Sequence, residues 1–283
     1  MPGTKLSEGP RVAAMPGVIL VILDHPEEAS GLLTATSCLA DLIGGAVINA
    51  LIARTPPQAT ISTEEILTKQ REDYIRAQEQ VRAAAIAQVF RDWLRSASSV
   101  AHISDIEVVA AAAVAQRGPN ADFVVIEQPA HRRHGRNAQT ISSALFETDR
   151  PVLVVPPGCK KDFGRRIAVA WRDDNRTISA VRAAMRCLGH VERLLVLAGQ
   201  RDGAARPQMP EILVEHGVPA ELFVLPIGRH AFGAALLDRA HELGADMIAM
   251  GAYAHHSPLR EMIFGGVTRY MIEHADVPVL MRH

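Results

Sequence analysis

The feature that most constrains the fold is a repeated alternation of short apolar runs and helical segments along the chain. The runs are bounded by turn residues and rich in Val, Ile, Leu, Ala and Met. In the first half they span 18–23, 46–53, 105–109, 122–126 and 151–155, and in the second half 166–171, 193–198, 221–225, 246–250 and 278–281. Continuous runs of this kind are typical of strands covered on both faces, and therefore of a parallel sheet.

Segments with helical periodicity lie between the runs. They are predicted at 29–43, 62–94, 110–117 and 139–146, and again at 177–188, 210–216, 231–243 and 267–274. The long second helix is expected to begin at Ser62, with Glu65 completing a capping box. Strands that alternate with helices imply right-handed crossovers. The predicted fold class is therefore α/β, with two tandem Rossmann-like domains, each a five-stranded parallel sheet flanked by helices.

The duplication is also visible in the letters. ADFVVI at 121–126 resembles ADMIAM at 245–250, and the tripeptide PVL occurs at both 151–153 and 278–280. A period this long indicates two duplicated domains and not a solenoid. We expect domains at 12–157 and 164–283, joined by a linker rich in Pro, Gly and charged residues.

Composition limits the function classes. The formal net charge is −1, so no basic excess points to nucleic acid as a partner. The apolar stretch at 12–23 is too short to span a membrane and no small-residue cleavage site follows it, so we expect no membrane partner. Three scattered cysteines (Cys38, Cys159 and Cys187) suggest a reducing compartment, which favours a cytoplasmic protein.

A candidate anion site follows the fourth strand of the second half. In an open α/β sheet, ligands bind beyond the carboxyl ends of the strands, where the strand order reverses. Gly251 ends this strand, and Gly265 and Gly266 precede the last helix, which contains Thr268. Unpaired N–H groups at a helix start attract a phosphate. The alternative is that these glycines serve only turn geometry and tight packing.

The segment 250–283, MGAYAHHSPLREMIFGGVTRYMIEHADVPVLMRH, resembles the C-terminal end of a universal stress protein domain. The segment 145–157, LFETDRPVLVVPP, resembles the same region less closely. The family has a G-x2-G-x9-G-(S/T) signature after strand four. The resemblance implies an adenine nucleotide α-hydrolase-like fold, a cytoplasmic stress-response function without enzymatic activity, and ATP as the ligand of the signature loop.

The second half departs from the family pattern at several positions. Gly251 matches the first glycine and Gly265 the third, whereas the second glycine is missing and the spacer is one residue longer. Gly266 stands where Ser or Thr is expected, and Thr268 follows two positions later. At the end of the first strand of this half, Arg172 occupies the position of the family's adenine-binding Asp.

The first half shows the opposite departures. Asp24 ends strand one in the family position that meets adenine, but the strand-four loop, 127–137, lacks the glycine pattern. Glu127 would disfavour a nearby phosphate, while the arginines of that loop (Arg132, Arg133 and Arg136) would favour one. Alternatively, Asp24 caps the first helix or orients its loop.

Other functional classes find less support. The loop histidines (His131, His134, His255 and His256) lack further ligands at suitable spacing, so no metal site is expected. The sequence holds no G-x-S-x-G, Walker A or H-E-x-x-H motif, which argues against an enzyme. A slow ATP hydrolase and a pure protein-interaction module both remain open.

The duplication also predicts how the two halves meet. The last strands, 151–155 and 278–281, are expected to pair within the chain as an intrachain pseudo-dimer, which hides two sheet edges at once. Association of two chains into a homodimer is left open.

Overall fold

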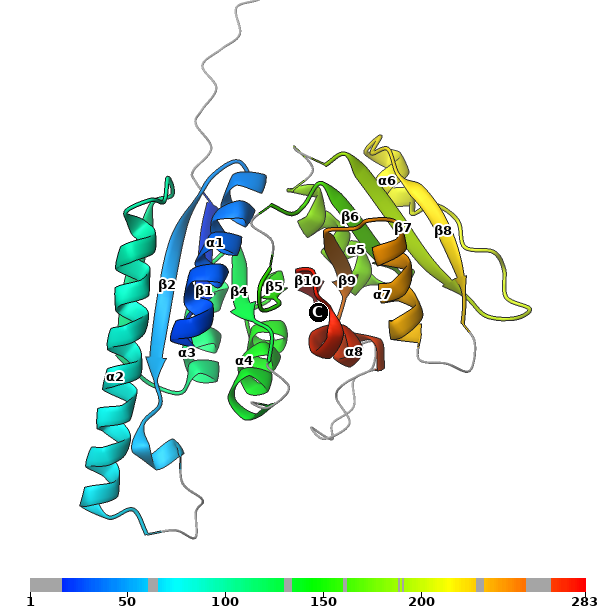
Figure 1. Cartoon of the computed structure of the whole chain (residues 1–283). Helices are drawn as coiled ribbons and strands as arrows, with labels where there is room; N and C mark the ends of the chain where they lie inside the picture. The colour runs from blue at the N-terminus through cyan, green and yellow to red at the C-terminus, as the bar shows by residue number, and fades with distance from the viewer. Residues whose placement is uncertain are drawn as a thin grey trace, which may run out of the picture.

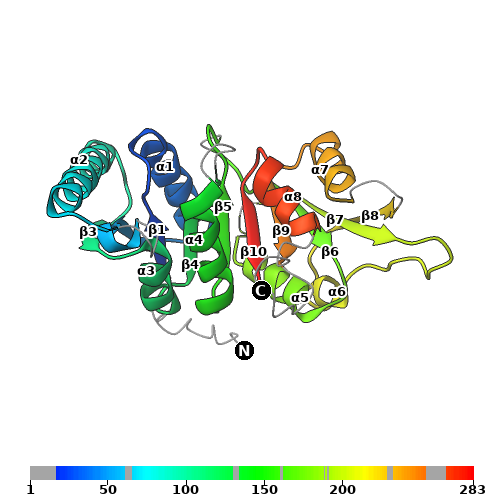
Figure 2. The same ribbon diagram turned by 90° about the horizontal axis from the view of Figure 1, so that it is seen from below.

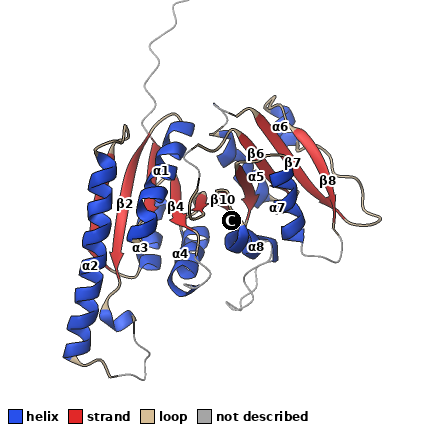
Figure 3. Ribbon diagram, viewed as in Figure 1, coloured by secondary structure: helices blue, strands red, loops and turns tan. Residues whose placement is uncertain are grey.

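The structure is a computed structural model, and it describes residues 17–60, 66–129, 134–159, 162–187, 189, 191–227, 232–252 and 266–283. The described strands form one ten-stranded sheet with helices on both faces (Figures 1 and 2). The predicted α/β class with mostly parallel strands is confirmed. Figure 3 shows the same arrangement by element type.

The first half contributes five strands, four α-helices and two short 3-10 helices. They are β1 (Gly17–Ile22), α1 (Pro26–Leu42), β2 (Ala46–Arg54), η1 (Pro57–Ala59), α2 (Lys69–Leu94), β3 (Ala101–Glu107), α3 (Ala110–Arg117), η2 (Gly118–Asn120), β4 (Phe123–Glu127), α4 (His134–Glu147) and β5 (Val152–Val155). The second half repeats the order of strands and α-helices. It has β6 (Arg166–Trp171), α5 (Asn175–Met185), β7 (Arg193–Gln200), α6 (Glu211–Glu215), β8 (Glu221–Pro226), α7 (Phe232–Glu242), β9 (Met247–Gly251), α8 (Gly266–His274) and β10 (Val279–Arg282).

The strand order is β3-β2-β1-β4-β5-β10-β9-β6-β7-β8, so each half has the doubly wound order 3-2-1-4-5. All strand pairs within a half are parallel. The order reverses between β1 and β4 in the first half, and between β6 and β9 in the second. These two reversal points are where an α/β sheet of this kind places its ligands.

The two halves meet through one antiparallel pair of strands. Leu280 lies opposite Leu153, with Val279 opposite Val154 and Met281 opposite Val152. The register is symmetric about the two leucines, as expected for a pseudo-twofold axis between duplicated halves. The pairing expected from the sequence is therefore present, and neither β5 nor β10 remains a sheet edge.

Side chains extend this junction beyond the strands. Gln128 Nε2 donates to the backbone oxygen of Ala275 at 3.0 Å, and Arg282 Nη2 donates to Asp149 Oδ1 at 2.6 Å. The hydrophobic core is also continuous across the junction. One buried cluster lies under α1, α2, α5 and α6, and a second lies under α3, α4, α7 and α8, and each includes residues of both halves.

Most element boundaries differ from the sequence predictions by up to three residues, and the starts of β3, α2 and α4 differ by more, with α4 beginning at His134 and not at 139. The third strand was expected at 105–109 but spans Ala101–Glu107, because an edge strand with one exposed face carries alternating polar residues and no continuous apolar run. Helix α2 begins at Lys69, since the Thr68 side chain accepts from Arg71 N at 3.3 Å and residues 66–68 are not helical. The expected capping box at Ser62 and Glu65 lies outside the described residues.

No helix within the described ranges is long and apolar enough to cross a membrane.

The continuous sheet predicts cooperative unfolding of the two halves. Leu280 is fully buried, and Leu280→Ala is expected to lower the free energy of unfolding by about 2–5 kcal/mol. In the Trp93→Phe protein, urea unfolding is followed by the remaining Trp171 in the second half. In the Trp171→Phe protein, it is followed by Trp93 in the first half. With Leu280→Ala added, both transitions are expected to shift together. The exposed Val214→Ala is the control with little effect. A shift confined to Trp171 would show that the halves unfold independently.

Candidate functional site

A groove of about 1270 Å³ lies at the reversal point of the second half. The ends of β6, β7 and β9 and the start of α8 contribute to it, and its lining includes Trp171, Thr177, Gly251, Gly266 and Thr268. We call it the α8 groove. Ligand pockets typically have roughly 300–1,000 Å³, so the groove has room for a ligand of nucleotide size.

Gly251 is required by packing. A Cβ at this position would lie 2.8 Å from both the backbone nitrogen and Oγ1 of Thr177. Thr177 is in the first turn of α5, where Asp174 Oδ1 accepts from Thr177 N at 2.8 Å as the helix N-cap. The close approach of α5 to β9 therefore explains this glycine without any ligand, as the packing alternative proposes.

Gly266 has the opposite surroundings. It is exposed at the first residue of α8, a Cβ added there would meet no atom of the described residues within 4 Å, and its φ is not in the left-handed region. Neither packing nor backbone conformation calls for a glycine at this position. The first turn of α8 thus borders the groove, and a helix start in such a place can bind an anion.

The other predicted residues of this loop have different outcomes. Thr268 lines the groove but is only 4% exposed, so its side chain belongs mostly to the groove wall. Gly265 lies outside the described residues, together with His255 and His256. Arg172 lines the groove in the position expected from the sequence, and its Nε lies 3.4 Å from Asp174 Oδ2.

In the first half, a group of charged and polar side chains lies at the reversal point. Arg82 of α2 reaches over the ends of β1 and β2. Its Nη1 donates to Asp24 O at 2.7 Å and to Asp24 Oδ1 at 3.1 Å, and its Nη2 donates to Ala53 O at 2.6 Å and to Glu79 Oε2 at 2.8 Å. Glu79 Oε2 also accepts from Thr55 N at 2.9 Å. Asp24 is thus held by α2.

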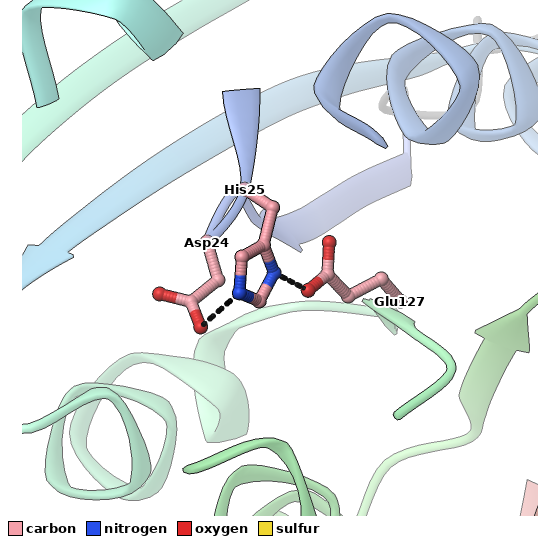
Figure 4. Close-up of side chains that lie close together, drawn as sticks. All are labelled: Asp24, His25 and Glu127. Carbon is pink, nitrogen blue, oxygen red and sulfur yellow. Dashed lines mark hydrogen bonds and ion pairs between the residues drawn. The ribbon is translucent and has the colours of Figure 1, made fainter. Parts of the chain in front are cut away.

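His25 and Glu127 complete this arrangement. Figure 4 shows the His25 ring between two carboxylates: Nδ1 is hydrogen-bonded to Glu127 Oε1, and Nε2 lies 3.8 Å from Asp24 Oδ2. Glu127 is only 5% exposed and ends β4 at the position that Gly251 holds in β9. We call Asp24, His25, Glu79, Arg82 and Glu127 the polar cluster.

The suggestion that Asp24 caps the first helix is wrong. The N-cap of α1 is His25, without a side-chain cap bond, and Asp24 instead pairs with Arg82. Sequence reasoning also missed Arg82 and Glu79, which lie in the long helix and far from Asp24 in the chain. A signal was available in the spacing: Glu79 and Arg82 share one side of the helix with the buried Ala83, Ile86 and Phe90.

The three cysteines contact the same core cluster, under α1, α2, α5 and α6. Burial raises the pKa of Cys159 to about 11 and that of Cys187 to about 12, and it also raises the pKa of Cys38. The thiolate is the nucleophilic form, so burial suppresses their reactivity at neutral pH.

Comparison with known proteins supports the fold and the resemblance. Residues 227–283 match the model of the universal stress protein family. A universal stress protein from Archaeoglobus fulgidus is similar in structure, with a TM-score of 0.71 at 16% identity, covering 94% of this chain and 96% of that one. A putative universal stress protein from Pseudomonas aeruginosa gives a TM-score of 0.61 at 13% identity, covering 95% and 93%.

At these identities the structural likeness shows the fold alone, although it extends over nearly the whole chain. No curated protein matches the sequence.

The packing explanation of Gly251 is testable by one added methyl group. Gly251→Ala is expected to lower the free energy of unfolding by about 1–3 kcal/mol, because the methyl group meets α5 backbone. The matched control is Gly31→Ala in α1, where a Cβ meets no atom within 4 Å and stability should rise by up to about 1 kcal/mol. Denaturant titration measures both. Equal stability of Gly251→Ala and the wild type would contradict the packing explanation.

Proposed function

We propose that this chain, which carries a universal stress protein domain at its C-terminus and has that family's fold in both halves, is a non-enzymatic stress-response module. We further propose that it binds one adenine nucleotide, in the α8 groove of the second half. The observation that supports this placement most directly is the start of α8 at Gly266, inside a groove at the reversal point of the sheet.

The groove offers partners for the phosphates and the base of a nucleotide. The phosphates would accept hydrogen bonds from the N–H groups of the first turn of α8, where the helix dipole favours negative charge. Arg172 and Arg176 also line the groove and would add charge-assisted contacts. Trp171, at the end of β6, provides an aromatic surface on which the base can stack.

The polar cluster argues against a second nucleotide in the first half. Glu127 places a buried carboxylate where the second half has Gly251, and a carboxylate repels a phosphate. Arg82, which could otherwise attract a phosphate, is engaged by Asp24 and Glu79. The expected stoichiometry is therefore one nucleotide per chain.

The non-enzymatic part of the proposal rests on the sequence, which holds no familiar catalytic motif. A slow ATP hydrolase on the same fold and an interaction module that has lost nucleotide binding are the competing functions. Nucleotide titration and phosphate release distinguish both from the proposed function.

The Gly266→Asp variant is expected to weaken nucleotide binding without lowering the stability of the fold. A carboxylate at a helix start stabilises the helix by about 0.3–1 kcal/mol but repels a phosphate there. Calorimetric titration with ATP, ADP and AMP should give one site in the wild type and at least tenfold weaker binding in Gly266→Asp. Thermal unfolding should show no loss of stability. Gly31→Asp in α1 introduces the same charge far from the groove and should bind like the wild type.

Three results would each contradict part of the proposal. Absence of binding to any of the three nucleotides would favour the interaction module, and equal binding by Gly266→Asp would place the site elsewhere. Release of inorganic phosphate from ATP above a buffer control, and its loss in Gly266→Asp, would support the hydrolase.

A further inference from the structure

A second group of side chains converges at the carboxyl ends of the strands, in the half where we place no nucleotide. Asp24 and His25 follow β1, and Glu127 ends the neighbouring strand β4. One potential ligand atom from each of the three side chains lies within 4.8 Å of the other two (Figure 4). The ligand atoms are one imidazole nitrogen and two carboxylate oxygens.

We propose that Asp24, His25 and Glu127 form a binding site for a borderline divalent cation, of which Zn²⁺ is the best match. Zn²⁺ is bound in proteins by His nitrogen and by Asp or Glu oxygen at about 2.0–2.2 Å. Purely hard cations such as Mg²⁺ and Ca²⁺ prefer oxygen ligands, so the imidazole favours a transition metal. Three protein ligands would leave a fourth position for water or a further ligand.

Charge favours a cation at this place. In the polar cluster, three carboxylates and one guanidinium leave a net charge of −2 when His25 is neutral. The cluster is largely buried: the side chains of Asp24, His25 and Glu127 are 13%, 21% and 7% exposed. Negative charge in a poorly solvated place is costly, and one divalent cation would neutralise it.

The surrounding contacts orient the ligands. Arg82 Nη1 donates to Asp24 Oδ1 at 3.1 Å, which leaves Oδ2 directed toward the imidazole. Glu79 pairs with Arg82 at 2.8 Å and so compensates the positive charge that would otherwise oppose a cation. Groups that hold metal ligands in this way are a regular part of metal sites.

The backbone of the site is also rigid. Glu127 is within the sheet, in register with Val155 of β5. His25 O accepts from Ala29 N at 3.0 Å, which fixes His25 at the start of α1. Ligands on strand ends and a helix start need only side-chain movement to bind an ion.

That movement is small. His25 at present directs one ring nitrogen to each carboxylate, whereas a single ion takes one of the two nitrogens. Two ligands at about 2.1 Å from a tetrahedral ion lie about 3.4 Å apart. The ligand atoms now lie within 4.8 Å of one another, so binding would draw the more distant pairs together and separate the hydrogen-bonded His25 Nδ1 and Glu127 Oε1. Torsion changes of Asp24 and Glu127 can supply these shifts.

The test measures Zn²⁺ binding to the full chain by competition with a chromophoric chelator. The wild type is expected to bind one Zn²⁺ per chain tightly, and His25→Gln and Glu127→Gln should each weaken this binding at least tenfold. The control is His241→Gln. His241 Nε2 also pairs with a carboxylate, Asp276 Oδ1, at 2.5 Å, but among the described residues no third ligand joins them. This variant should bind like the wild type.

A second measurement reports coordination itself. Co²⁺ added to the wild type should give visible d–d absorption that His25→Gln lacks, a signal that a change in stability alone would not produce. Zn²⁺ should also raise the thermal midpoint of the wild type and not that of the two ligand variants. Because His25→Gln keeps a polar side chain between the carboxylates, it supplies the test if Glu127→Gln unfolds.

Three results would overturn the proposal. The first is unchanged Zn²⁺ affinity in both ligand variants, and the second is an equal loss of affinity in His241→Gln. The third is the absence of stoichiometric binding by the wild type, which would leave the cluster as a salt-linked network only. None of these results bears on the nucleotide proposal, whose residues lie in the other half.

Discussion

The antiparallel pairing of β5 with β10 is the interaction on which the rest of the structure depends. It joins two five-stranded parallel sheets into one ten-stranded sheet and removes two apolar edges from solvent. The two core clusters then extend through both halves instead of ending at a domain boundary. A homodimer of single domains would have to associate to form this contact, whereas the tandem chain contains both strands. The sequences of the two halves can consequently differ without loss of the contact between them.

They differ at the reversal points of the sheet. In the second half, Gly251 allows α5 to pack close to β9, and Gly266 at the start of α8 borders the groove. In the first half, Glu127 takes the position of Gly251, and Arg82 from the long helix α2 connects Asp24 with Glu79. The helix between the second and third strands explains much of this contrast. It is 26 residues long as α2 and only 5 residues long as α6, and α6 carries no equivalent of Arg82.

The sequence predicts the sheet well, because buried parallel strands are the most recognisable pattern in this fold. Runs such as 166–171 coincide with the observed strand, and others differ by one or two residues at an end. The exposed edge strand β3 was misplaced, since its polar alternation carries a weaker signal. At the candidate sites, Asp24 was recognised by position, but its contact with Arg82 was not, because 58 residues separate the two in the chain. Periodicity reports which face of a helix is buried; it does not report which charge on that helix meets a distant strand end.

The central claim is that the second half binds a ligand in the α8 groove, while the first half carries the polar cluster at its reversal point. Fluorescence of the Trp93→Phe protein tests it directly, because Trp171, in the lining of the α8 groove, is then the sole tryptophan. The account predicts a saturable change in Trp171 emission as ATP is added, with the same midpoint as binding measured by equilibrium dialysis. Saturable binding in dialysis with no change in Trp171 emission would locate the nucleotide away from the groove and contradict the account.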